Sequence, residues 1–194
     1  MTTVSSWAFQ ADPTENWSFM DDVFSPEECR QIIAIGEARM PAPAKVAPKG
    51  VVAAGVRDSR VVFLHPADEM EWAFRRMTDA VMLLNERYFG FDLFGMTEGF
   101  QFTRYDAPTG FYGAHIDKAF GSTIRKLSLT VQLSPPGDYD GGELALQIGV
   151  EPVPMPRQQG QLIVFPSYVL HEVRPVTRGT RYSLVSWVTG APFR

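Results

Sequence analysis

The sequence is poor in the residues and patterns that define several common protein classes. Its 194 residues include one cysteine, Cys29, so neither an intramolecular disulfide nor a multi-cysteine metal cluster can form. Cys29 lies among isoleucines in a predicted amphipathic helix, with no histidine near it in the sequence. This setting predicts a buried, unreactive thiol and fits a reducing cytoplasm.

Long apolar runs and an excess of positive charge are also missing. No window reaches the ~18 uninterrupted apolar residues of a membrane span, and the N-terminus lacks the basic and apolar segments of a signal peptide. We therefore expect a cytoplasmic protein without a membrane partner. The 18 basic and 22 acidic side chains give a net charge of −4 and are spread along the chain, so no nucleic-acid partner is expected.

The first half of the chain carries helix signals. Ser25, Pro26 and Glu28 form a predicted capping box at the start of a helix that ends near Met40. The Pro- and Ala-rich stretch from Pro41 to about Gly55 predicts a loop. A second helix is expected after Pro66 and before Gly90. Its apolar stripe consists of Met70, Phe74, Met77, Val81, Leu84 and Tyr88.

From Gly99 onward the hydrophobic pattern changes to a period of two. In KLSLTVQLS, apolar residues alternate with Ser128, Thr130 and Gln132, which predicts a strand whose two faces meet different environments. Further strand-like runs are GFQFTRY, GGELALQI, QLIVF and RYSLVSWV, with PPGDYDGG as a turn. Strands without helices between them favour an antiparallel sandwich or barrel.

The predicted fold is therefore mainly β with flanking helices. With 194 residues and 45% hydrophobic content, the chain can bury one substantial core and is too short for two usual domains. Residues 1–95 are expected to supply helices and a loop that pack on a β-domain over residues 96–190, in one structural domain overall.

Two of the three histidines stand in strand-like segments. His115 and Asp117 are two residues apart in FYGAHIDKAF, so on a strand they share one face, and His171 lies in VLHEV. Two imidazoles and one carboxylate suit Fe(II) and leave positions for other ligands. Taken alone, His115 and Asp117 also fit a surface accident or a structural hydrogen bond. His65 precedes Pro66, and capping or solvent exposure explains it.

Arg181 favours a metal site over the other interpretations of His115 and Asp117. In RYSLVSW, strand alternation places Arg181 and Ser183 on an inward face shared with Val185 and Trp187. An inward guanidinium is costly unless an anion meets it, and no acidic residue occurs between residues 174 and 194. A dicarboxylic acid bound by arginine at one end and by iron at the other satisfies both groups.

Several ordered motifs together resemble one enzyme family. HID, YDGGEL and LIVFPSYVLHEVRPVTRGTRYSLVSW resemble the Fe(II)/2-oxoglutarate-dependent dioxygenases of the prolyl 4-hydroxylase-like branch, which includes bacterial PKHD-type hydroxylases. The resemblance covers roughly residues 96–190. It implies a double-stranded β-helix, a distorted jelly roll with helices packed on one sheet. It also implies Fe(II), 2-oxoglutarate and O2 as cofactors, with ascorbate as a reductant.

The resemblance also implies roles for individual residues. The iron ligands would be His115, Asp117 and His171, and Arg181 would hold the distal carboxylate of 2-oxoglutarate. Further cosubstrate contacts are implied for Tyr105, Ser183, Thr130 and Gln132, and substrate-side positions for Tyr112 and Arg57. The two tyrosines are also ordinary strand aromatics. For Arg57 a solvated surface position is the favoured interpretation. Gly141 and Gly142 are expected to serve a turn, and Glu143 no metal.

The implied reaction is hydroxylation of a prolyl residue in a peptide or protein, with release of succinate and CO2. The carboxylate of Asp117 favours hydroxylation over halogenation, because related halogenases lack that ligand. The main alternative is a hydroxylase of a free amino acid or natural-product small molecule. A non-catalytic jelly-roll binding module would leave Arg181 without a use, and a nucleic-acid demethylase conflicts with the acidic balance. The sequence leaves the substrate and the oligomeric state open.

Overall fold

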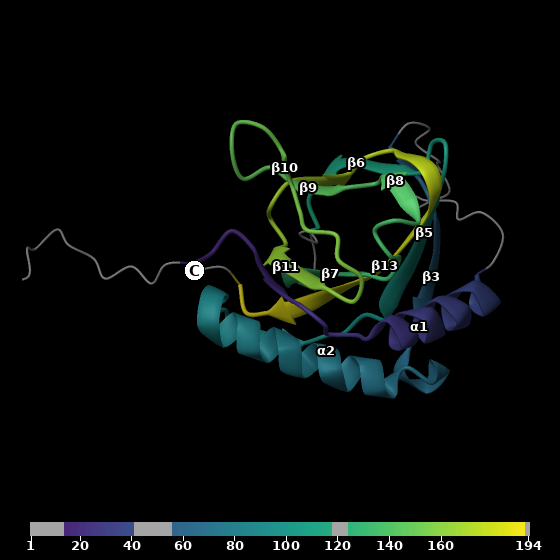
Figure 1. Cartoon of the computed structure of the whole chain (residues 1–194). Helices are drawn as coiled ribbons and strands as arrows, with labels where there is room; N and C mark the ends of the chain where they lie inside the picture. The colour runs from purple at the N-terminus through teal and green to yellow at the C-terminus, as the bar shows by residue number, and fades with distance from the viewer. Residues whose placement is uncertain (1–13, 41–55, 118–123, 193–194) are drawn as a thin grey trace, which may run out of the picture.

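Two antiparallel sheets face each other, and two helices cover the outer face of the larger one (Figure 1). The computed structural model describes residues 14–40, 56–117 and 124–192. The loop predicted for residues 41–55 lies outside this part. No helix within the described residues is long and apolar enough to cross a membrane.

The first helix, α1 (Pro26–Arg39), begins at the predicted capping box. The Ser25 hydroxyl accepts from the Glu28 amide at 3.2 Å, and the Glu28 carboxylate accepts from the Ser25 amide at 2.8 Å. Because these bonds satisfy two otherwise unpaired amides, the chain enters the helix at a defined residue. The helix ends at Arg39 and is capped by Met40, close to the predicted end.

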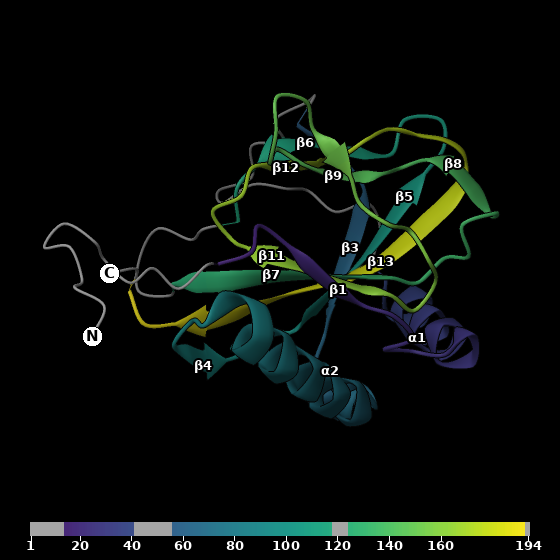
Figure 2. The ribbon, with the colours of Figure 1, turned by 60° about the vertical axis from the view of Figure 1, so that its left-hand side comes forward.

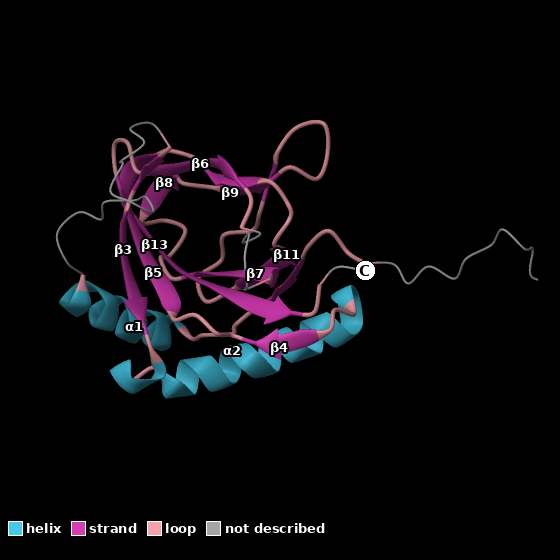
Figure 3. Cartoon of the chain, turned by 180° about the vertical axis from the view of Figure 1, so that it is seen from behind, coloured by secondary structure: helices cyan, strands magenta, loops and turns pink. Residues whose placement is uncertain are grey.

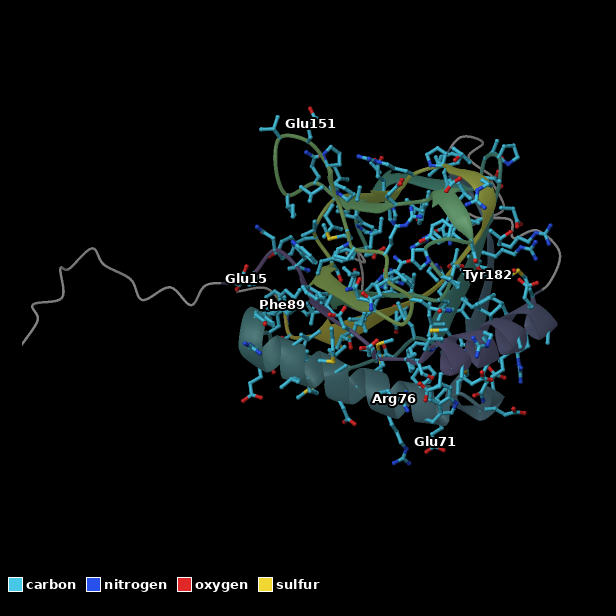
Figure 4. The ribbon with its side chains drawn as sticks, in the orientation of Figure 1. Glu15, Glu71, Arg76, Phe89, Glu151 and Tyr182 are labelled. Carbon is cyan, nitrogen blue, oxygen red and sulfur yellow. The ribbon has the colours of Figure 1, made fainter. Side chains whose placement is uncertain are left out.

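The second helix, α2 (Glu71–Leu84), follows a short 3₁₀ turn, η1 (Pro66–Asp68). It continues into one π-helical turn, η2 (Asn85–Phe89), which ends at Gly90 with φ of 63°. Arg76 of α2, which is labelled in Figure 4, donates to the Glu28 carboxylate of α1 at 2.6 Å and thereby links the two helices.

The larger sheet has the strand order β1-β11-β7-β13-β5-β3, and β4 and β8 pair with β13 beside this path. The strand at its centre, β13, is also its longest, and both helices lie below this sheet (Figures 2 and 3). The bounds are β1 Ser18–Met20, β3 Arg60–Leu64, β4 Leu93–Gly95, β5 Phe100–Asp106, β7 Arg125–Gln132, β8 Tyr139–Gly141, β11 Leu162–Pro166 and β13 Val176–Gly190.

The smaller sheet has the order β10-β9-β12-β6-β2. From β5 onward the chain passes repeatedly between the two sheets, so the arrangement is a jelly roll, and the predicted fold class is confirmed. The bounds are β2 Arg57–Asp58, β6 Phe111–His115, β9 Leu144–Leu146, β10 Val153–Pro154 and β12 His171–Val173.

Strand β7 shows how the period-two pattern positions the site. Its apolar residues, such as Leu129 and Val131, pack into the core between the larger sheet and the helices. Its polar residues, Ser128, Thr130 and Gln132, are equally buried but contact groups between the two sheets. The two environments predicted for this strand are therefore an apolar core and a polar interior.

The thiol of Cys29 is fully buried in α1, as the sequence predicts. Burial disfavours the charged thiolate and raises the pKa of Cys29 to about 11. The thiol therefore stays protonated and unreactive at neutral pH.

Close packing at Gly36 provides a test of the interface between α1 and β5. A β-carbon at this position would lie 2.4 Å from the ring of Phe102, which is fully buried and stacks on Tyr182. Gly36→Ala should therefore destabilise the fold by about 1–3 kcal/mol through overpacking. Urea denaturation measures this free energy. An increase of up to about 1 kcal/mol, which helix propensity alone would give, would contradict the packing argument.

Candidate metal and cosubstrate site

Pairing between β6 and β12 brings the two candidate histidine ligands together. His115 and His171 are register partners, with ring centroids 4.2 Å apart. Asp117 lies two residues beyond the end of β6, and its carboxylate oxygens are 3.6 Å from His115 Nε2 and 3.4 Å from His171 Nε2. One ligand atom from each residue lies within 4.8 Å of the others. The three residues converge as expected, although the strand stops before it reaches Asp117.

Backbone carbonyls orient both imidazoles. Nδ1 of His115 lies 2.8 Å from the Gly113 carbonyl oxygen, and Nδ1 of His171 lies 3.0 Å from that of Val169. A carbonyl oxygen can only accept, so each Nδ1 carries the proton and donates. Each Nε2 therefore keeps a lone pair directed toward the shared centre, which is the tautomer that a metal ligand needs.

The carboxylate of Asp117 is held from the larger sheet. The Ser128 hydroxyl donates to Oδ2 of Asp117 at 2.8 Å. The Ser167 hydroxyl lies 3.0 Å from that of Ser128 and, because Ser128 has only one proton to give, donates to it. The two serines thus form a buried chain that fixes one carboxylate oxygen. Strand alternation placed Ser128 on the polar face of β7, but nothing in the sequence paired it with Asp117.

Arg125 fixes the backbone of the same residue. Its guanidinium donates to the Asp117 carbonyl at 3.3 Å and makes two bonds to the Glu98 carboxylate, at 2.7 and 2.5 Å. It also stacks 3.7 Å from the centroid of the Trp187 ring. Sequence reasoning missed Arg125, because the ion pair with Glu98 joins positions far apart in the chain.

Burial changes the acid–base behaviour of His115. Desolvation, followed by the proximity of His171, lowers the pKa of His115 to about 4. The imidazole is therefore neutral over the physiological range, and its Nε2 is available to a cation without loss of a proton.

This pKa predicts a loss of stability in acid for the metal-free protein. The unfolded chain takes up the His115 proton near the ordinary pKa of 6.5, whereas the folded chain takes it up near 4. Stability is therefore fully present above about pH 6.5 and falls by about 2 kcal/mol between about pH 7.5 and about pH 5. Urea denaturation of wild type and His115→Gln at both pH values measures this contribution. An equal loss in the two proteins would contradict it.

One open cavity of ≈180 Å³ connects the candidate ligands with Arg181. Its wall combines residues from both sheets, including most of the residues selected from the sequence. Those lining it are His115, Asp117, His171, Arg181, Tyr105, Ser183, Thr130, Tyr112 and Arg57. Sequence reasoning missed Phe63 and Gln101, which are register partners on β3 and β5. Gln101 shares the strand parity of Tyr105, which is a signal that could have found it.

Arg181 lies at the closed end of this cavity and is 1% exposed. Its guanidinium donates to the Gln132 side-chain oxygen at 2.9 Å and to the Ser183 hydroxyl at 3.4 Å, while its Nε has no partner. Tyr105, its register partner on β5, presents its ring 5.4 Å from the guanidinium carbon. Among the described residues no carboxylate pairs with Arg181, so the buried charge lacks a counter-ion.

The structure adds a contact with Arg181 to the predicted roles of two neighbours. Gln132 was expected to line the cosubstrate pocket, but it is absent from the cavity wall and instead holds the guanidinium. Gly142 adopts φ of 65°, as the predicted turn requires, and a β-carbon there would lie 3.0 Å from Arg181 Cδ. The glycine therefore also makes room for the arginine side chain.

Arg57 contradicts the favoured prediction of a solvated surface arginine. It is half-buried, its Nε donates to the Ser59 hydroxyl at 2.5 Å, and its guanidinium carbon lies 4.4 Å from the centroid of the Tyr112 ring. That ring in turn stacks on His115, with centroids 3.6 Å apart. Tyr112 and Arg57 thus lie at the end of the cavity that contains the candidate metal ligands, whereas Arg181 lies at the other end.

His65 and Glu143 behave as expected from the sequence. His65 is exposed at the start of η1, where its backbone amide donates to Asp68 at 2.6 Å. Oε1 of Glu143 lies 3.7 Å from Nη1 of Arg157, and Glu143 does not belong to the group of converging ligands.

A family comparison shows which class of protein the part of the chain around this cavity resembles. Residues 100–189 match the family model described as the 2OG-Fe(II) oxygenase superfamily. The matched range contains the three converging ligands and Arg181. Over this range the chain is similar to the superfamily, and the similarity supports Fe(II), 2-oxoglutarate and O2 as cofactors.

Within the superfamily, the similar curated proteins are PKHD-type hydroxylases. One from Sphingopyxis alaskensis is 36% identical over 130 residues, which cover 64% of this chain and 59% of that protein. Another from Prochlorococcus marinus is 47% identical over 78 residues, covering 40% of this chain and 35% of that protein. The chain thus spans less than two thirds of the length of these relatives. The similarity is thus to the PKHD-type branch.

Solved structures share the fold over most of the chain. A Pseudomonas putida prolyl-4-hydroxylase superimposes with a TM-score of 0.70 at 22% identity, covering 92% of this chain and 95% of that one. A Trichoplax adhaerens prolyl hydroxylase, in complex with a peptide fragment of the hypoxia inducible factor oxygen degradation domain, gives 0.74 at 17% identity, with coverages of 90% and 84%. At these identities the likeness concerns the fold.

Proposed function

We propose that the chain is an Fe(II)- and 2-oxoglutarate-dependent dioxygenase that hydroxylates a prolyl residue in a peptide or protein, releasing succinate and CO2. The observation that carries this proposal is the single cavity that joins three converging ligands to a buried arginine without a counter-ion. The names of the related PKHD-type and prolyl hydroxylases support the choice of substrate.

The residues present fit both cofactors. His115, Asp117 and His171 would hold Fe(II), because each offers an unprotonated or anionic atom to one shared centre. Arg181, with Ser183 and Tyr105 beside it, would hold the distal carboxylate of 2-oxoglutarate. Bound together, Fe(II) and 2-oxoglutarate supply the oxidising chemistry, with O2 as the oxidant and ascorbate as an external reductant.

The remaining cavity residues orient groups and exclude water. Gln132 holds the Arg181 guanidinium in place, so that little ordering is needed when the carboxylate arrives. Val185 and Trp187 cover the interior from β13 and keep bulk water from the polar groups. Tyr112 and Arg57 would meet the substrate, because they lie at the ligand end of the cavity.

The test is a succinate assay with purified protein, Fe(II) and 2-oxoglutarate. A library of proline-containing peptides and a metabolite library are supplied separately, and mass spectrometry records a gain of one oxygen. We expect succinate and hydroxylated product from the peptide arm, with Asp117→Ala inactive. Turnover of metabolites alone would replace the prolyl substrate with a small molecule. An intact protein that binds neither Fe(II) nor Mn(II) would instead indicate a binding module.

A further inference from the structure

Two hydrogen-bond donors at the metal-ligand end of the cavity have no acceptor. One is the NH2 nitrogen of Arg57, which is buried and without a partner. The other is Nε1 of Trp187, in a side chain that is 5% exposed. Both residues line the cavity. A buried donor without a partner is costly, so both donors are expected to meet an acceptor from a ligand.

The positive charge of Arg57 is also unbalanced. Its sequence neighbour Asp58 accepts from the Thr109 hydroxyl at 2.7 Å instead, and within the described ranges no carboxylate forms an ion pair with Arg57. Two arginines of the larger sheet differ in this respect. Arg104 pairs with Glu37 at 3.0 Å, and Arg125 pairs with Glu98. Arg57 therefore has charge available for an anion from outside the chain.

The guanidinium of Arg57 is already held in position. Its Nε is fixed by the bond to Ser59, and its flat face lies over the Tyr112 ring. A guanidinium fixed by stacking binds a planar oxyanion with little loss of side-chain freedom. Because Nε is bonded to Ser59, the NH2 nitrogen without a partner is the part left for a ligand.

Arg57 and Arg181 serve different ends of the cavity. Arg181 is packed among Gln132, Ser183 and Tyr105, whereas Arg57 is linked through Tyr112 to His115. A single 2-oxoglutarate placed on Arg181 and the metal ligands satisfies Arg181 and leaves Arg57 unpaired. The metal-ligand end therefore still has a charge that a second anion can balance.

We propose that the substrate carries a carboxylate close to the carbon that is oxidised, and that Arg57 binds this carboxylate while the Trp187 indole donates to the same molecule. The proposal rests on the proposed function and specifies its substrate class. The carboxylate has two chemical sources, an acidic side chain next to the prolyl residue of a peptide or the free carboxylate of a small acid. In either case the matching amide should bind poorly.

Affinity selection with mass spectrometry tests this recognition without turnover. Protein loaded with Mn(II) and 2-oxoglutarate is mixed with matched acid and amide pairs. One arm contains proline peptides with Glu or Gln neighbours, and the other contains free imino and amino acids with their amides. We expect one arm to show retention of acids over amides on the order of tenfold, because a charge-assisted bond replaces a neutral one.

Variants separate Arg57 from general electrostatics. Arg57→Gln should abolish the preference for acids, and Arg57→Lys should keep part of it. Arg60→Gln is the matched control, because Arg60 is exposed on β3, the next strand along the chain, and it should behave as wild type. Unchanged binding of 2-oxoglutarate in every variant shows that the fold and the Arg181 end are intact.

Different outcomes would contradict the role of Arg57 and the dioxygenase proposal. Equal retention of acids and amides by wild type, retention of neither, or a full preference for acids in Arg57→Gln would overturn the role of Arg57. The retained molecules are then given to the succinate assay. Retained acids that produce no succinate would overturn the dioxygenase proposal, while recognition of carboxylates by Arg57 would stand.

Discussion

Asp117→Ala is expected to abolish succinate formation and to weaken Mn(II) binding. The substitution removes the only anion among the converging ligands, and it leaves the Ser128 hydroxyl without its acceptor. The loss should exceed the roughly 10–100-fold that removal of an outer hydrogen-bond partner costs a metal site. Electron paramagnetic resonance of Mn(II) measures binding separately from turnover.

Asp58→Ala is the matched control for this experiment. Asp58 is also an aspartate close to the metal-ligand end of the cavity, but it is exposed on β2 and accepts from Thr109. It should retain Mn(II) affinity and succinate formation. Normal metal binding in Asp117→Ala would remove Asp117 from the ligand set, and equal losses in both variants would point to a general effect of charge.

Arg181→Gln is expected to change affinity and stability in opposite directions. A buried charge without a counter-ion destabilises the ligand-free protein, so its removal should raise the free energy of unfolding by about 1–3 kcal/mol. The same substitution removes the charged partner of the distal carboxylate. The Kd and KM for 2-oxoglutarate should therefore rise by roughly a hundredfold.

Arg178→Gln is the control on the same strand, because this arginine has a side chain 58% exposed and pairs with Asp140. Its effect on either quantity should be small. Calorimetric titration with 2-oxoglutarate and urea denaturation measure the two effects. If Arg181→Gln bound 2-oxoglutarate as wild type does, the assignment of the carboxylate to Arg181 would be wrong. Lower stability of the ligand-free variant would show that the guanidinium is balanced in the folded protein.

The parts of the site that the sequence predicted share a strong periodic signal. Alternation along β7 and β13 indicated which side chains face inward, and it placed Arg181, Ser183 and Thr130 in the cavity. Residue spacing similarly brought His115 and Asp117 to one side of the chain. Alternation is local, so it identifies a face of a strand from a few consecutive residues.

The parts that were missed depend on contacts between distant segments. Arg57 lies on a two-residue strand, which is too short to show any period, and only its stacking on Tyr112 reveals its direction. Alternation correctly placed Gln132 on the inner face of its strand, but it did not predict the contact with Arg181. The register between β7 and β13 sets that contact, and the sequence of one strand does not contain it.

The two ends of the cavity belong to different sheets. His115 and His171 lie on paired strands of the smaller sheet, whereas Arg181 lies on the central strand of the larger one. A molecule that binds both ends connects the two sheets and opposes their sliding or separation. Binding at either end stabilises the folded state by mass action, and a molecule that binds both ends also connects the two sheets. We therefore expect the bound metal to raise the affinity of the protein for the dicarboxylate, and the bound dicarboxylate to raise its affinity for the metal.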